Sequence, residues 1–335
     1  MASRKQSHVE FIPLFQKSFL LPRYWGIWLG ITILATITLI PARLRDPVLG
    51  SFGRIAGRFA PNARRRALIN LLYCLPEKSE LERKRIVDSM FSTMLQSTAM
   101  MVELALRPNT VKTRIHWHRR DILDELRDSR QNVILLVPHS WAVDLPVMLL
   151  AAEGQRMAAM FHHQSNLFID YIWNLVRYKC GTRMHARNDG ILPFIKSIRQ
   201  GYWGYYLPDQ DHGERHSEFA DFFSTYKATL PIMGRMMRVC RAKIVPLFPV
   251  YNSKTHSLDI YLRAPFIEND FSSDSVKQAR RLNAEVEVFV RPNPEQYTWI
   301  LKLLKTRRPG DQEPYARREL YPIKDKNHAF IERRF

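Results

Sequence analysis

The sequence predicts an α/β protein, in which a central, mainly parallel sheet is flanked by helices and preceded by an N-terminal membrane helix and an N-terminal helical segment. Three observations support this fold class. From about residue 113, short apolar runs alternate with segments of helical pattern, as in repeated strand–helix–strand units. One long uncharged apolar run stands near the N-terminus. Apolar residues make up 46% of the 335 residues, which allows a packed core and excludes a disordered chain or a fibrous repeat.

The first element is the uncharged run at 24–40, YWGIWLGITILATITLI. As a helix it would cover about 26 Å, slightly less than a ~30 Å hydrocarbon core. Trp25 and Trp28 suit an interfacial aromatic belt, and the excess of basic residues downstream places that side in the cytoplasm. We therefore expect a single membrane-inserted helix. A helix lying in the interface and a buried core helix remain alternatives, because the run contains three threonines.

Positive charge is concentrated at the N-terminus. The formal net charge is +19, and residues 1–70 hold eleven basic against two acidic residues, a net charge of +9. Such a field needs an anionic partner, namely nucleic acid, acidic lipid or an acidic protein. Residues 64–66, three consecutive arginines, open the stretch ARRRALINLLYCL, which suits a helix against anionic headgroups, although charge runs usually only face water. The basic residues surround an apolar run rather than exposed aromatics, so we expect no nucleic-acid binding.

The remaining elements follow in chain order. A long helix is expected at 80–106, closed by Pro108. The run NVILLV at 132–137 is continuously apolar, as a strand buried on both faces would be, and 257–262 alternates like an outer strand. Further strands are expected at 157–161, 202–207 and 243–250, and helices at 145–152, 166–178, 190–200, 232–241, 274–290 and 295–305. Four regions result: a membrane anchor (1–45), a basic amphipathic helical segment (46–112), a domain with an H-x4-D motif (113–306) and a charged surface tail (307–335).

The candidate catalytic pair is His139 and Asp144. In such sheets, ligands bind beyond the carboxyl ends of the strands, and His139 follows the strand at 132–137. In a continuous helix the two side chains would lie about 140° apart, so they meet only if His139 stands in the loop before the helix. An imidazole placed there takes a proton from a hydroxyl while the carboxylate holds its tautomer. The alternative is that Asp144 only complements the helix dipole and His139 is a turn residue.

Other chemistries have weaker signals. Ser140 beside His139 suggests a serine hydrolase, but no G-x-S-x-G elbow is present. His162 and His163 would face opposite sides of a strand, so we predict no metal site. The three cysteines are far apart and lack metal-ligand spacing, and a reducing compartment fits best.

Four ordered blocks carry a family resemblance. An H-x-x-x-x-D pair, an Arg-bearing block, a block after a strand and a V-P-x-x-P block resemble glycerolipid-type acyltransferases of the lysophospholipid acyltransferase superfamily. They stand at 139–144, 187–190, 207–211 and 245–249. More narrowly, VPHSWAVD, HARNDG, RQGYWGYYLPDQDHG and EQYTWILKLLKTR are similar to the late acyltransferases of lipid A biosynthesis, of the myristoyltransferase type, and the N-terminal RYWG, RLRDP and RRRALINL extend the resemblance over nearly the whole chain. The third block departs from the general pattern, because it carries Asp209-Gln210-Asp211 where a Glu-Gly pair is common.

The resemblance implies a reaction and its partners. An acyl chain, myristoyl by this resemblance, moves from an acyl carrier protein thioester to a hydroxyacyl chain of a Kdo-bearing, already lauroylated lipid A precursor. No cofactor is implied. The location would be the bacterial inner membrane, with the catalytic domain on the cytoplasmic side. A basic, membrane-bound enzyme suits both an acidic carrier protein and an anionic lipid.

The same resemblance implies substrate-binding residues in the second and third blocks, namely Arg187, Asp189, Asp209, Gln210 and Asp211. A guanidinium fork suits phosphate oxygens, so Arg187 is the candidate anion contact; a structural ion pair with Asp189 or Asp209 is the alternative. The roles of Asp209 and Asp211 stay open between ordering the site and holding Arg187. Two other functions remain as alternatives: an acyltransferase acting on a lysophospholipid, and a non-catalytic membrane-interaction protein.

Overall fold

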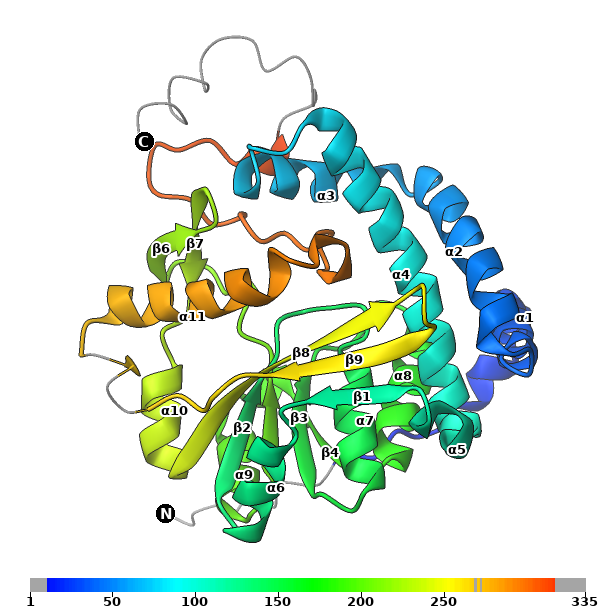
Figure 1. Cartoon of the computed structure of the whole chain (residues 1–335), viewed down its shortest axis with the longest axis horizontal. Helices are drawn as coiled ribbons and strands as arrows, with labels where there is room; N and C mark the ends of the chain where they lie inside the picture. The colour runs from blue at the N-terminus through cyan, green and yellow to red at the C-terminus, as the bar shows by residue number, and fades with distance from the viewer. Residues whose placement is uncertain (1–10, 268–269, 272, 317–335) are drawn as a thin grey trace.

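The computed structural model describes residues 11–267, 270–271 and 273–316. It confirms an α/β fold with a mainly parallel central sheet flanked by helices (Figure 1). The seven strands lie in the order β1-β9-β8-β2-β5-β3-β4, and every neighbouring pair is parallel except β8 and β9. The sheet strands are β1 (Ile115–His118), β2 (Asn132–Leu136), β3 (Met157–Phe161), β4 (Thr182–Ala186), β5 (Trp203–Tyr206), β8 (Ala242–Asn252) and β9 (Ser257–Leu262).

A two-stranded hairpin, β6 (Glu218–Phe222) and β7 (Thr225–Thr229), stands apart from the sheet and was not predicted. The α-helices are α1 (Trp25–Ile37), α2 (Ala42–Arg58), α3 (Pro61–Cys74), α4 (Glu80–Leu106), α5 (Pro108–Lys112), α6 (Asp121–Asp128), α7 (Asp144–Ala152), α8 (Leu167–Lys179), α9 (Leu192–Arg199), α10 (Met233–Cys240) and α11 (Ser275–Val290). The predicted helix at 80–106 and the predicted strands at 157–161 and 257–262 have the observed bounds.

Strand β2 is buried on both faces, as its apolar run predicts. Val133 and Leu135 belong to the core that includes residues of α4 and α7, whereas Ile134 and Leu136 belong to the core formed with α9 and α10. The carboxyl end of β2 therefore lies between two packed layers, and the loop that follows it is held in a fixed position.

The predicted membrane-spanning helix at 24–40 is wrong. Helix α1 has 13 residues, about 20 Å of helix, and no helix in the described part of the chain is long and apolar enough to cross a membrane. The Thr38 hydroxyl donates back to the Ala35 carbonyl (2.6 Å) at the end of the helix. Pro41 then disfavours helical geometry at Ile40, and the chain turns into α2.

The arginines at 64–66 hold the fold together rather than facing a surface. Arg64 pairs with Asp88 of α4 (2.5 Å). Arg65 and Arg66 donate to the carbonyls of Tyr315 (3.0 Å) and Ile300 (2.9 Å). All three arginines thus have partners in α4 or in the C-terminal segment, and their contact with anionic headgroups stays a prediction.

The predicted helix at 295–305 is also wrong. Only Pro294–Gln296 forms a short 3₁₀ turn. The Asn70 amide donates to the carbonyls of Trp299 (2.6 Å) and Leu301 (2.8 Å), which a helix would use internally. The described start of the expected surface tail is likewise packed: Tyr315 is buried, and its hydroxyl donates to Asn70 Oδ1 (2.6 Å). Residues 317–335 lie outside the described residues.

Candidate active site

His139 and Asp209 meet because their strands are adjacent and in register. Parallel pairing of β2 with β5 places Leu136 opposite Tyr206, and each polar residue follows three positions later. The Asp209 carboxylate accepts hydrogen bonds from both the main-chain N–H (2.8 Å) and the Nδ1–H of His139. With Nδ1 hydrogen-bonded to a carboxylate, the Nε2 atom is left as the basic nitrogen of the ring.

Asp209 is ionised despite complete burial. Burial alone would raise the pKa of the carboxyl, but the charge of His139, its hydrogen bonds and the charge of Lys227 lower that pKa to about 2. Lys227 is itself fully buried on β7, and its Nζ donates to the Asp209 main-chain carbonyl (2.8 Å). The charges of the two buried residues Asp209 and Lys227 therefore offset each other. Lys227 also fixes the backbone of the Asp209 loop.

Asp144 does not form the expected pair with His139. Its carboxylate accepts from Arg177 Nε (2.8 Å) and Nη2 (2.9 Å) and from Trp173 Nε1 (3.1 Å), all on α8. The reason is that α7 begins at Asp144 itself, so the side chain points to the neighbouring helix α8. Both His139 and Asp144 nevertheless line the same cavity.

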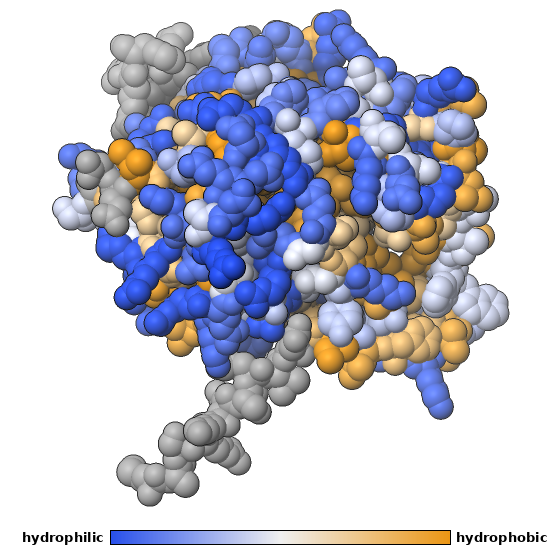
Figure 2. Space-filling model, turned by 60° about the horizontal axis from the view of Figure 1, so that its bottom comes forward, coloured by the Kyte–Doolittle hydropathy of each residue, from blue (hydrophilic) through white to orange (hydrophobic). Residues whose placement is uncertain are grey.

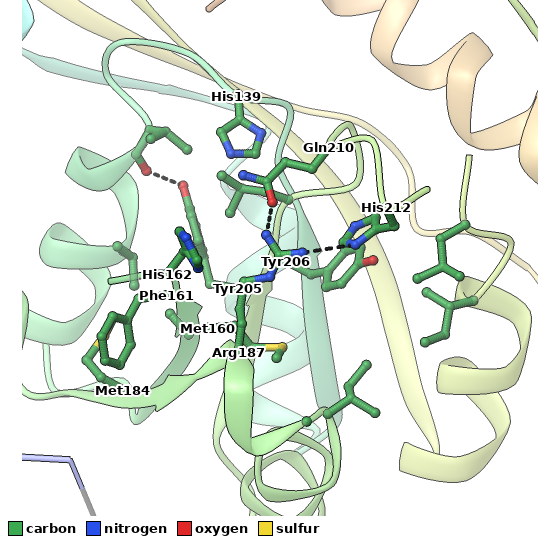
Figure 3. A pocket seen from close by; sticks show the side chains of 18 of the residues that line it. His139, Met160, Phe161, His162, Met184, Arg187, Tyr205, Tyr206, Gln210 and His212 are labelled. Atoms are coloured by element: carbon green, nitrogen blue, oxygen red, sulfur yellow. Dashed lines mark hydrogen bonds between the residues drawn. The ribbon is translucent and has the colours of Figure 1, made fainter. Parts of the chain in front are cut away.

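Arg187 is held by the third block. Its guanidinium donates to Gln210 Oε1 and to His212 Nδ1 (2.9 Å), and these two contacts are drawn in Figure 3. Burial, followed by the charges of Arg187 and Lys227, lowers the pKa of His212 to about 4, so its ring is neutral near pH 7 and can accept this bond. The two alternative ion pairs of Arg187, with Asp189 and with Asp209, are therefore not the contacts that the structure forms.

The two remaining carboxylates lie elsewhere. Asp189 is exposed and is not among the residues that line the cavity. Asp211 is turned away from Arg187, because its oxygens accept from the Thr306 N–H (2.7 Å), the Thr306 hydroxyl (2.7 Å) and the Gly213 N–H (2.9 Å). Asp211 thus joins the third block to the C-terminal segment.

A cavity of about 940 Å³ joins these groups to apolar walls. In Figure 3, His139, Gln210, Arg187 and His212 lie toward one end, and Phe161 and Met184 lie toward the other. The volume is at the upper end of the ~300–1,000 Å³ typical of small-molecule sites. Other apolar lining residues are Val143, Val147, Ala159, Met160, Leu207, Leu230, Ile232 and Leu301. A long apolar chain with a polar head fits this distribution.

The competing chemistries receive no support from the geometry. Ser140 is 3% exposed and is not among the cavity-lining residues, whereas its neighbour His139 is. His162 lines the cavity while the His163 ring pairs with Asp170 (2.8 Å), so the two imidazoles, which lie just after β3 rather than in a strand, have different surroundings.

Three features of the site were missed at the sequence level. The first is Lys227, which lies in the hairpin that was not predicted. The second is Arg177, which lies on helix α8 and belongs to no recognisable sequence motif. The third is the segment 296–298: the Thr298 N–H donates to the His139 carbonyl (3.0 Å) and the Trp141 N–H donates to the Gln296 carbonyl (3.2 Å). The quoted stretch EQYTW was the available signal, but it was assigned to a helix rather than to a support for the His139 loop.

Comparison with known proteins adds the family. The sequence profile of the bacterial lipid A biosynthesis acyltransferases matches residues 12–306. The chain is 60% identical over 321 residues to the lipid A biosynthesis myristoyltransferase of Escherichia coli K12, covering 96% of this chain and 99% of that protein. It is 39% identical to a lipid A biosynthesis acyltransferase of Haemophilus influenzae (92% and 96% covered) and 26% identical to the lipid A biosynthesis lauroyltransferase of E. coli (91% and 99% covered).

The profile match covers most of the chain, and the identities extend over nearly its full length. Together with a hydrogen-bonded His–Asp pair beside a cavity that has many apolar lining residues, they lead to one conclusion. The chain belongs to the bacterial lipid A biosynthesis acyltransferase family and is an acyltransferase.

Proposed function

We propose that this enzyme transfers a myristoyl chain from an acyl carrier protein thioester to the hydroxyl of a hydroxyacyl chain on a Kdo-bearing, already lauroylated lipid A precursor. The observation that carries the proposal is the hydrogen-bonded His139–Asp209 pair, whose His139 lines a cavity that also has many apolar lining residues. The myristoyl choice follows the relative at 60% identity, a lipid A biosynthesis myristoyltransferase, since identity to the lauroyltransferase is only 26%.

The proposed mechanism needs one base and no protein nucleophile. His139 Nε2 takes the proton of the acceptor hydroxyl as the hydroxyl oxygen attacks the thioester carbonyl carbon. When the tetrahedral intermediate collapses, the C–S bond breaks, and the departing thiolate takes the proton from His139. Asp209 keeps the Nδ1–H tautomer and stabilises the imidazolium, the role first expected of Asp144.

Arg187 is the proposed anion contact beside this pair. Both of its present partners, Gln210 and the neutral His212, are uncharged, so its positive charge is not neutralised by them. A phosphate of the acceptor or of the carrier's prosthetic arm can therefore replace or join these contacts as a bidentate ligand. Gln210 serves to orient the guanidinium, and Asp209 acts on His139 rather than on substrate.

Membrane contact is proposed through the surfaces of α1 and α2 instead of through a spanning helix. Helix α2 buries its small and paired residues and exposes an apolar stripe, Leu44, Val48, Phe52 and Ile55, which continues to Phe59 just after the helix. Helix α1 exposes Trp25, Leu29 and Ile33 at helical spacing. In Figure 2 hydrophobic residues gather on the right, the side on which α1 and α2 lie in Figure 1. An exposed apolar stripe flanked by Arg43, Arg54 and Arg58 suits a helix lying in an anionic membrane surface.

The test uses the purified full-length protein with two donors and two acceptors. Myristoyl-acyl carrier protein and myristoyl-coenzyme A are each offered with the lauroylated precursor and with a lysophospholipid. We expect turnover with the carrier thioester and the lipid A precursor, and a loss of about 10²–10⁴-fold in the His139→Ala protein. Wild-type melting behaviour of the variant would show that the fold is intact.

Two results would contradict the proposal. Wild-type turnover by a folded His139→Ala protein would remove the base mechanism. A preference for the lysophospholipid over the lipid A precursor would show that the proposed acceptor is wrong. It would support the alternative, an acyltransferase that acts on a lysophospholipid.

A further inference from the structure

Helices α9 and α10 carry four exposed basic side chains. Neither helix contains an acidic residue. Lys196, Arg199, Arg235 and Arg238 are exposed, and none forms an ion pair or a side-chain hydrogen bond with a residue that the structure describes. By contrast, three arginines on and just after α11 are all in ion pairs with carboxylates: Arg280, Arg281 and Arg291.

These cations lie on two neighbouring helices that border the cavity. Helices α9 and α10 pack against each other. Ile191 and Ile232, which precede the two helices, line the cavity, and so does Arg235. Two exposed apolar side chains, Leu192 and Val239, lie on the same helices. We call this surface the α9–α10 basic surface: Leu192, Lys196, Arg199, Arg235, Arg238 and Val239.

The basic surface lies on the other side of the molecule from the apolar helices. In Figure 1, α9 and α10 lie at the lower left and α1 and α2 at the right, and in Figure 2 hydrophilic residues cover the left of the face shown. A membrane bound along α1 and α2 would therefore leave α9 and α10 open to water. Arg177 of α8 and Arg235 of α10 both line the cavity. Helix α8 packs against α1 through Phe168 and Trp28, so Arg177 lies on the side of the proposed membrane contact.

We propose that the α9–α10 basic surface is the docking site of the acyl carrier protein, so that donor and acceptor reach the cavity from opposite sides. The inference rests on the proposed donor. An acidic carrier matches four unpaired cations, and complementary charge speeds encounter and sets orientation. Leu192 and Val239 supply an apolar contact within the charged rim, as protein interfaces require. From this surface the acyl chain of the carrier needs only to pass Arg235 to enter the cavity.

The experiment reverses two charges that do not line the cavity. The variant is Lys196→Glu with Arg238→Glu, and the matched control is Arg85→Glu with Lys254→Glu, two exposed cations on α4 and in the β8–β9 turn. Measured are KM and kcat with myristoyl-acyl carrier protein, the Kd of the holo carrier protein at low and high salt, and binding to anionic phospholipid vesicles. We expect KM and Kd to rise about tenfold or more in the variant, with kcat and vesicle binding within about twofold of wild type and a weaker salt dependence.

Several outcomes would overturn the docking site. Unchanged KM and Kd in the variant would show that the carrier protein does not dock here. Turnover by the wild type with the carrier thioester would still support the proposed donor. An equal rise in the control would assign the effect to net charge rather than to this surface. A loss of vesicle binding in place of carrier binding would make the surface a lipid contact. Failure of wild type to use the carrier thioester at all would instead remove the proposed function together with the docking site.

Discussion

Asp209, rather than Asp144, is the carboxylate that is hydrogen-bonded to the His139 ring in this structure. In the Asp209→Asn variant the Nδ1–H tautomer and the imidazolium lose their support, so kcat should fall by about 10²–10⁴-fold. In Asp144→Asn the lost partner is Arg177, so we expect a lower Tm and a kcat near the wild-type value.

Steady-state kinetics and thermal melts of both variants make the comparison. The assignment is wrong if kcat falls by this factor in Asp144→Asn and stays near the wild-type value in Asp209→Asn.

His212 should make stability depend on pH. Its pKa is lowered to about 4 in the folded protein, against about 6.5 in an unfolded chain, so the unfolded state takes up the proton first as pH falls. The contribution of the neutral ring is therefore fully present above about pH 6.5 and is lost between pH 6.5 and 4. Melting temperatures at pH 7.5 and 5.0 should differ more for wild type than for His212→Asn, which keeps an acceptor for Arg187 but does not titrate. Equal pH dependence of the two proteins would contradict this.

Part of the site could be predicted from single residues. The strand-end position of His139 and the polar block after β5 were both predicted from apolar runs that end in polar residues. The partner of His139 was not, because the pairing depends on which strand lies beside β2 and in which register. H-x4-D spacing places two residues near each other along the chain, but the start of α7 decides where Asp144 points.

Glycine spacing in α2 sets how closely it packs on α4. A Cβ added at Gly53 would lie 2.4 Å from the Phe91 carbonyl oxygen, a backbone atom that cannot rotate away. Gly53→Ala should therefore force the two helices apart and cost roughly 1–3 kcal/mol. Gly30→Ala in α1 is the matched control, since nothing lies within 4 Å of its added Cβ and alanine favours helix by up to about 1 kcal/mol.

Thermal or denaturant unfolding of the two variants tests this packing. A Gly53→Ala protein as stable as Gly30→Ala would show that α2 and α4 are not held in contact at this point.

Elements were predictable where a periodic pattern was long or a strand was apolar throughout. Helix α4 has a Ser79 capping box and runs from Glu80 to Leu106 as expected. The segment after Pro294 has helical composition, but contacts with distant elements hold it in another form. The Asn70 side chain of α3 donates to two of its carbonyls, and its own Gln296 side chain bonds the main chain of Tyr251 in β8 (2.9 and 3.0 Å). Such long-range contacts are not encoded in local pattern, so the helix prediction failed there.

Some of the basic residues in the N-terminal region are paired within the protein, so they cannot bind an anionic partner. Arg45 is buried and paired with Asp46 and Glu103 (2.8 Å each), and Glu103 also pairs with Arg114 (2.5 Å). A buried network of this kind ties α2 to α4, and composition alone cannot distinguish it from a surface charge.

The cytoplasmic placement of the catalytic domain stays a prediction.

Membrane binding should depend on the exposed stripe of α2. The double variant Phe52→Asp with Phe59→Asp removes two aromatic side chains that are 61% and 83% exposed. Because burying each would contribute about 1.5–3 kcal/mol, affinity for anionic phospholipid vesicles should fall on the order of 10²-fold or more. Val276→Asp on α11 exchanges an exposed apolar residue away from this surface and should leave binding unchanged. Vesicle co-sedimentation measures both, and equal binding of all three proteins would exclude α2 as the membrane contact.

The most direct test of the whole account is mass spectrometry of lipid A from cells that lack this protein and then receive either the wild-type gene or the His139→Ala gene at matched protein levels. We expect the wild type to add one acyl chain of myristoyl mass, located by fragmentation on a hydroxyacyl chain, and the variant to add none. An unchanged lipid A with the wild-type gene, or full acylation with His139→Ala, would contradict it.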